Sequence, residues 1–187
     1  MIVTYFGDGC FRLQAGETSL LVDPVTQRLK ADVALKTLTP TSLASWAANE
    51  VPFPGEYELK GLEIRGWEVP EESTEKFLKT VYRVDWEEIS FAFLGHLSKT
   101  LPSHLAEKLG EPDVLFLPVG GGHFLTPQDA AKVIKQLEPQ VAIPSFFTSP
   151  KDFLKATGQR REPQEKFVFK KKDLGKEVGK VVVLQRG

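Results

Sequence analysis

Three histidines are the side chains of this protein best suited to metal binding or proton transfer. They are His96, His104 and His123. A hydrolytic zinc site needs about three imidazole or carboxylate ligands and an open position for water. The histidines lie far apart in sequence, and no His-x-His or His-x-x-x-His pair places two ring nitrogens on one face. The spacing therefore does not predict a conventional zinc centre.

His96 and His123 each follow an apolar segment with the pattern of a strand, whereas His104 falls in a short amphipathic helix and is expected on the surface. If the two strands end at one rim of a sheet, these histidines can meet there, with Asp23 and Glu56 as acidic neighbours. A metal site rebuilt from the four residues is one hypothesis. Loop capping by hydrogen bonds is the interpretation we favour, because ligand geometry is strict and no spacing motif supports a metal.

A run of three glycines, Gly120, Gly121 and Gly122, stands between an apolar strand and a capped helix. Loop amides and helix N-termini attract anions, so such a loop can hold a phosphate. The phosphate-binding P-loop has Gly-Lys-Ser/Thr before its helix, however, and here Phe124 and Leu125 intervene. The glycines are better explained by a tight turn that keeps the backbone clear of a neighbouring loop.

Short apolar runs separated by turn residues predict strands in the first half of the chain. These strands cover residues 2–5, 10–14, 18–22, 32–36, 62–65, 81–84 and 89–94, and residues 53–59 are expected as a turn that leads into a further strand. A short helix is expected over residues 43–48, after a hydroxyl cap and an early proline. The acidic residues 70–76 have the composition of an exposed loop.

The second half of the chain alternates strands and helices. Residues 113–147 contain an apolar strand, the glycine loop, a helix that starts at Thr126-Pro127, and a second apolar strand. Additional elements are expected as helices over residues 101–109 and from 149 to Gly158, and as strands over 166–169 and 181–184. Strands followed by alternating strands and helices predict an α/β sandwich.

Length and composition favour a single cytoplasmic domain over residues 1–187. With 41% hydrophobic residues the chain can bury one sizeable core, and it has no apolar run of membrane-spanning length. The single cysteine, Cys10, cannot form an internal disulfide and is expected to be buried on a strand. We expect neither a membrane nor a nucleic acid as partner, since no aromatic platform or recognition helix accompanies the basic residues.

Four blocks of sequence, at residues 7–11 with 20–24, 54–58, 113–122 and 141–144, follow one another in an order found in a known family. They resemble the metallo-β-lactamase fold, in the branch of zinc-dependent hydrolases related to ascorbate-6-phosphate lactonase. The resemblance spans nearly the whole chain. It implies a four-layer αββα sandwich with a site at one rim, where loops of both sheets meet.

The same resemblance implies that the metal ligands of the family are missing from this chain. The positions of the family's His-x-His-x-Asp-His run are occupied here by Leu38, Pro40, Ser42 and Leu43. Its next histidine falls on Phe93, the aspartate of a following Gly-Asp pair falls on His96, and the final histidine falls on Phe146. Apolar residues at these positions would fill the cavity and remove the cost of an empty buried polar site.

Together these observations favour a non-catalytic binding or interaction protein without a metal cofactor, whose partner is an unknown small ligand or protein. The candidate rim pocket comprises Asp23, Glu56, His96, Gly121, Gly122, His123 and Phe146. The first alternative is a metal-dependent hydrolase of an ester, lactone or phosphoester, with zinc or another divalent metal near the histidines. A second alternative is polyanion binding through residues 151–187, which carry 11 basic and 5 acidic side chains.

Overall fold

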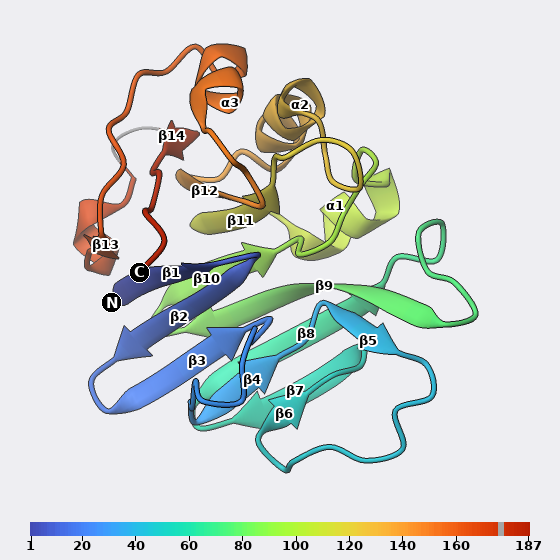
Figure 1. The fold of residues 1–187 in the computed structure, drawn as a ribbon. Helices are drawn as coiled ribbons and strands as arrows, with labels where there is room; N and C mark the ends of the chain where they lie inside the picture. The colour runs from blue at the N-terminus through green and yellow to red at the C-terminus, as the bar shows by residue number, and fades with distance from the viewer. Residues whose placement is uncertain (176–177) are drawn as a thin grey trace.

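Two β-sheets packed face to face form the body of the protein (Figure 1). The computed structural model describes residues 1–175 and 178–187. The first sheet has six strands in the order β13-β1-β2-β3-β4-β6. Their bounds are β1 Ile2–Gly7, β2 Cys10–Ala15, β3 Thr18–Val22, β4 Val33–Leu35, β6 Glu50–Val51 and β13 Lys166–Val168.

The second sheet has eight strands, in the order β14-β12-β11-β10-β9-β8-β7, with β5 paired to β9 beside this path. Their bounds are β5 Leu38–Pro40, β7 Gly55–Leu59, β8 Leu62–Glu68, β9 Phe77–Trp86, β10 Ile89–Phe93, β11 Val114–Pro118, β12 Val141–Ser145 and β14 Lys180–Val181. The strands β10, β11, β12 and β14 run parallel, whereas β7, β8, β9 and β10 form antiparallel pairs.

A hydrophobic core fills the space between the two sheets. Strand β1 alternates between inward and outward side chains, so Val3 and Tyr5 enter this core with Phe11 from β2. Phe116 on β11 meets Phe11 from the opposite sheet, with ring centroids 4.8 Å apart. Cys10 is fully buried, as expected for a small apolar residue on a strand.

Three α-helices cover the other face of the eight-stranded sheet: α1 Ser103–Leu109, α2 Pro127–Leu137 and α3 Lys151–Ala156 (Figure 1). The predicted start of α2 is confirmed, since the Thr126 side chain accepts a hydrogen bond from the Asp129 N–H at 3.1 Å. Strand β11 is buried at every position because it is covered by a sheet on one side and by helices on the other.

The α/β sandwich expected from the sequence is thus confirmed, with differences in detail. The α-helices in the described part of the chain all pack on the eight-stranded sheet, so they supply one helical layer rather than two. The helix predicted over residues 43–48 is wrong, and the chain forms turns and loop there. Residues 44–48 are all exposed, so a short helix would have no apolar stripe to bury and little to stabilise it.

The carboxyl ends of five strands meet at one rim of the sandwich. In the first sheet these are the parallel neighbours β3 and β4, and in the second they are β10, β11 and β12. The loops that follow these strands carry Asp23, Thr37, His96, the glycine run and Phe146. Loops at the carboxyl ends of parallel strands are where α/β proteins build their sites. No helix in the described residues is long and apolar enough to cross a membrane.

Candidate functional site

A hydrogen-bonded line of three side chains joins the two sheets at this rim. The Thr37 backbone N–H donates to Asp23 Oδ1 at 2.7 Å, and the Thr37 hydroxyl donates to Asp23 Oδ2 at 2.6 Å. The same hydroxyl oxygen lies 2.9 Å from His96 Nδ1. Because its only proton is directed to Asp23, the hydroxyl accepts from the ring, which places the imidazole proton on Nδ1. His96 Nε2 then carries the lone pair that can accept a proton.

Burial sets the charge of this pair of titratable groups. It raises the pKa of the Asp23 carboxyl above its usual range, while His96 and the hydrogen bonds from Thr37 act in the opposite direction. Burial also lowers the pKa of the His96 imidazole, against the attraction of Asp23. The lowered pKa keeps His96 neutral near pH 7, which is the form that can act as a base.

Unusual backbone conformations cluster at the same strand ends. Asp23 and Phe146 adopt left-handed φ values of 45° and 55°, which non-glycine residues rarely do. Gly95 has φ 48°, and a Cβ placed on it would lie 1.9 Å from Thr37 Oγ1. Glycine is therefore required at position 95 for the Thr37 hydroxyl to reach His96. Strained residues of this kind persist where the surrounding structure fixes them, often at functional sites.

Two aromatic rings form an apolar wall beside His96. The His96 ring centroid lies 5.0 Å from that of Phe146 and 6.0 Å from that of Phe124. The two phenylalanine rings stack at 4.1 Å with an interplanar angle of 19°. The Phe146 N–H donates to the buried Tyr5 hydroxyl at 3.2 Å, which holds this end of β12 in place.

Glu72 fixes the loop that follows His96. Its side chain is only 2% exposed and accepts from the Ser98 N–H at 2.8 Å, the Ser98 hydroxyl at 2.6 Å and the Lys99 N–H at 2.8 Å. The Lys79 ammonium donates to the same carboxylate at 2.7 Å. The expectation that residues 70–76 form an exposed loop is therefore wrong at Glu72, which links the β8–β9 connection to the His96 loop.

The sequence-predicted site residues divide into two groups. Asp23, His96 and Phe146 do come together at the rim, as described above. His123 and Glu56 are exposed, and neither side chain makes a hydrogen bond or ion pair with another described residue. Gly121 and Gly122 lie in a tight turn with φ of 69° and 64°, and the Gly121 N–H donates to the Leu125 carbonyl at 2.9 Å. His104 is exposed on α1, as expected.

Thr37 was missed as a site residue by sequence reasoning. Its position just after β4, at the same rim as Asp23, is the one local signal that could have indicated its role. Nothing in the local sequence pairs it with His96, because the two residues are 59 positions apart and meet only in the folded chain.

The donor set at the rim does not fit a zinc ion held by protein side chains alone. The described residues contain no group of three or more His, Cys, Asp and Glu side chains that could hold a metal ion. Asp23 and His96 are two such donors, against about three in a hydrolytic zinc site. Leu38 and Pro40, which take the places of family ligands, lie in β5, and Phe93 is buried in the core between the sheets.

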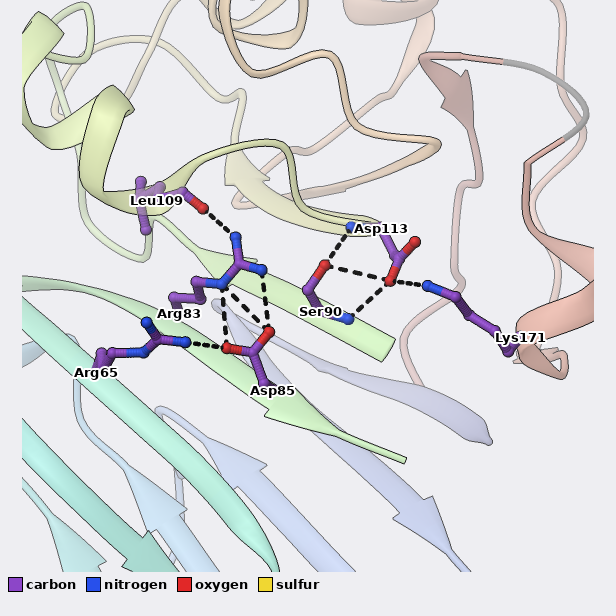
Figure 2. Close-up of polar contacts among 7 residues, drawn as sticks. All are labelled: Arg65, Arg83, Asp85, Ser90, Leu109, Asp113 and Lys171. Atoms are coloured by element: carbon purple, nitrogen blue, oxygen red, sulfur yellow. Dashed lines mark hydrogen bonds and ion pairs between the residues drawn. The ribbon is translucent and has the colours of Figure 1, made fainter. Parts of the chain in front are cut away.

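A second polar cluster lies away from this rim and has a structural role (Figure 2). Asp85 at the end of β9 accepts hydrogen bonds from Arg83 and Arg65, and Arg83 also donates to the Leu109 carbonyl at the end of α1. Asp113, just before β11, accepts from Ser90 and from the Lys171 ammonium at 2.6 Å. These carboxylates lie at the ends of the strands that are opposite to the rim. Because both are paired with cations or hydrogen-bond donors, they stabilise that end of the sheet.

Comparisons with known proteins agree on the family. A family model described as "Beta-lactamase superfamily domain" matches residues 2–145. A Thermotoga maritima protein, provisionally named a Zn-dependent hydrolase of the metallo-beta-lactamase superfamily, has a crystal structure similar to this chain with a TM-score of 0.82 at 27% identity. The similarity covers 98% of this chain and 97% of that one.

Two further proteins are similar to this chain. A metal-dependent hydrolase from Methanopyrus kandleri is 29% identical over 155 residues, which are 83% of this chain and 57% of that protein. The chain thus spans little more than half of this curated relative. A metallo hydrolase from Ignicoccus hospitalis shares the fold, with a TM-score of 0.70 at 18% identity, covering 90% of this chain and 99% of the other.

These comparisons correct two expectations drawn from the missing ligands. The interpretation as a non-catalytic binding protein is wrong, because the relatives that are similar to this chain over 98% and 83% of its length are named hydrolases. The expectation of no metal cofactor is wrong for the same reason, since those relatives are named metal-dependent or Zn-dependent. The match over residues 2–145 and the shared fold show that this chain belongs to the metallo-β-lactamase superfamily.

Proposed function

We propose that this protein is a metal-dependent hydrolase that cleaves an ester, lactone or phosphoester bond at the rim around His96. Family membership and the continuous similarity to the Thermotoga maritima protein support the reaction class. The observation that supports the place is the line from Asp23 through Thr37 to His96, which leaves His96 Nε2 able to accept a proton.

In this proposal His96 moves the proton of the reaction. Its neutral Nε2 accepts a proton from water as the water attacks, and returns it to the leaving oxygen. Asp23 acts through the Thr37 hydroxyl: it fixes the ring orientation and favours the imidazolium that forms during the reaction. The rings of Phe124 and Phe146 exclude water from one side of the imidazole. Asp23 and His96 alone are too few donors to hold a resident zinc ion.

The test combines metal analysis with activity. Protein purified without chelator is analysed for zinc, manganese and iron, and is then assayed with a nitrophenyl ester, a lactone and a nitrophenyl phosphoester with each metal added. We expect turnover of at least one substrate class that depends on added or bound metal. Absence of turnover with every metal and substrate class would contradict the proposal.

Histidine variants test the place of the reaction. His96→Ala should lower kcat by about 10²- to 10⁴-fold, the usual contribution of a general base. His104→Ala is the matched control, since His104 is exposed on α1 and should leave turnover unchanged. His123→Ala should also leave it unchanged, because His123 makes no hydrogen bond or ion pair with the described residues. Full activity of the His96 variant would refute the assignment of the base.

We further propose that the protein is a single domain that works in the cytoplasm. We also propose that the small ligand it binds is its substrate. The lone, buried Cys10 supports a reducing compartment. Fractionation of cells that express the full-length protein tests the location.

A further inference from the structure

A pocket of 470 Å³ opens beside the aromatic wall of the rim. Its apolar side is formed by Tyr5, Phe124, Phe146 and Phe147, and its polar side includes Asp8 and Arg186. We refer to it as the aromatic pocket. Its volume falls in the range of about 300–1,000 Å³ that is typical of small-molecule sites. The pocket is separate from the polar cluster of Figure 2.

The aromatic pocket shares its wall with His96. The Phe124 and Phe146 rings line the pocket, and the same two rings lie against the imidazole at 6.0 and 5.0 Å. A flat molecule that stacks on these rings would thus be held next to the proposed base. Ring pairs in offset or tilted stacking gain stability beyond the burial of area, which favours an aromatic ligand.

The turn between β1 and β2 is shaped to seat two of the pocket side chains. A Cβ placed on Gly9 would lie 2.3 Å from Phe146 Cζ, and one placed on Gly7 would lie 2.8 Å from Arg186 Nε. Side chains at positions 7 and 9 would therefore displace Arg186 and Phe146. The Gly187 N–H also donates to the Tyr5 carbonyl at 2.9 Å, which anchors the backbone next to Arg186 on β1.

Arg186 supplies a cation whose existing partner is weak. Its Nη2 lies 3.8 Å from Asp8 Oδ2, beyond hydrogen-bond distance, and the two side chains are 67% and 69% exposed. Exposed pairs of this kind contribute little, and Arg186 has no other ion pair with the described residues. A carboxylate or phosphate on a ligand can replace Asp8 and form two parallel hydrogen bonds with the guanidinium.

We propose that the aromatic pocket binds an aromatic anion, with its ring on the Phe124–Phe146 stack and its carboxylate or phosphate on Arg186. If the protein is the hydrolase proposed above, on which this part rests, the aromatic anion is the part of the substrate that is not cleaved. Binding of an aromatic anion in the pocket does not itself require turnover. The ring provides area and the anion provides orientation, as in other small-molecule sites.

Ligand-observed fluorine NMR with the full-length protein tests the proposal. The probes are 4-fluorobenzoate, 4-fluorophenyl phosphate, the neutral 4-fluorobenzamide and the non-aromatic fluoroacetate. We expect both aromatic anions to bind, the tighter one identifying the preferred anion, and the other two probes to bind at least about tenfold more weakly. Equal binding of the amide would overturn the role of charge, and equal binding of fluoroacetate would overturn the role of the ring.

Variants of exposed residues locate the bound probe. Arg186→Gln should weaken binding of the aromatic anions about tenfold or more, because it removes the charge-assisted contact. Asp8→Asn should tighten binding, because it removes the competing carboxylate. Arg28→Gln is the matched control, since Arg28 is an exposed arginine outside the pocket and should bind as the parent does. Unchanged binding by the Arg186 variant would place the site elsewhere and refute the proposal.

The two proposals fail in different ways. Binding of aromatic anions without turnover of any substrate would leave the pocket assignment standing and remove the hydrolase. Turnover that is lost in His96→Ala, with no binding of either aromatic anion, would leave the hydrolase and remove the pocket.

Discussion

Replacing Glu72 should loosen the loop that carries His96. The Glu72 carboxylate accepts three hydrogen bonds from Ser98 and Lys99 and one from the Lys79 ammonium. Its side chain is 2% exposed, so water cannot substitute for these contacts. Breaking a buried ion pair by removing one partner costs about 3–5 kcal/mol, so Glu72→Ala should lower the free energy of unfolding by about that amount.

Glu72→Gln separates the charge from the shape of the side chain. The amide keeps one acceptor oxygen, which can retain the contacts made by Oε2, but it loses the charge and the bond to the Lys99 N–H. We expect a loss of about 1–3 kcal/mol, the range for one buried hydrogen bond to a charged group. Urea unfolding measures both variants, and Glu71→Ala, at an exposed neighbouring position, is the control. A loss in Glu72→Ala no larger than in Glu71→Ala would refute the reasoning.

The pH dependence of stability gives an independent check. Burial, the largest single influence, raises the pKa of Glu72, but the hydrogen bonds from Lys79, Ser98 and Lys99 together outweigh it and leave the pKa below its usual value. The stability that Glu72 contributes is therefore present above its unfolded pKa of about 4.3 and is lost as pH falls through the lower folded pKa. The parent and Glu72→Gln should converge in stability in that acidic range. A constant difference from pH 7 to pH 2 would contradict this origin.

Three other perturbations test the rim and the core by urea unfolding. Gly95→Ala should lower the free energy of unfolding by about 3 kcal/mol or more, because it combines a left-handed φ with a clash against Thr37. Gly61→Ala is the control: Gly61 has φ 78° and open space around it, so the loss should be about 1–2 kcal/mol. Equal losses in the two variants would contradict the clash. Thr37→Val should cost about 1–3 kcal/mol, because Asp23 Oδ2 and the His96 Nδ1–H lose the hydroxyl between them while the bond from the Thr37 N–H to Asp23 Oδ1 remains, and it should also lower turnover; retained turnover would exclude a role for the hydroxyl. Leu117→Ala, at a fully buried position on β11, should cost about 2–5 kcal/mol, and a loss under 1 kcal/mol would mean that the helix-side core collapses around the cavity.

Elements that depend on local pattern were predictable from the sequence. Helix α2 has its cap, its first-turn proline and its apolar residues within one segment, and the structure places all of them as expected. Strand β3 was predicted at its observed bounds, because the turn before it and the proline after it define its ends. The alternation of strands and helices in the second half of the chain was sufficient to predict the fold class.

Contacts between distant segments were not predictable. Glu72 lies in an acidic stretch whose composition indicates solvent exposure, yet it is buried by Ser98, 26 positions away. The predicted helix over residues 43–48 failed for the opposite reason: its cap and proline are present, but the fold gives it no surface on which to pack. Contacts between side chains of the two sheets at the rim, such as that of Thr37 with His96, cannot be predicted from local sequence, because they depend on how the two sheets pack.

Phe146 explains how the rim can keep its shape while its side-chain chemistry changes. The resemblance places this residue where the family has its final histidine, and its φ of 55° is left-handed. Its surroundings fix that conformation, since Tyr5 accepts its N–H and a Cβ on Gly120 would lie 1.9 Å from its carbonyl oxygen. The backbone that presents the side chain is thus held by neighbours that do not depend on which side chain is presented. An aromatic ring there contacts His96 and lines the aromatic pocket, so this strand end presents a stacking surface where the family has an imidazole.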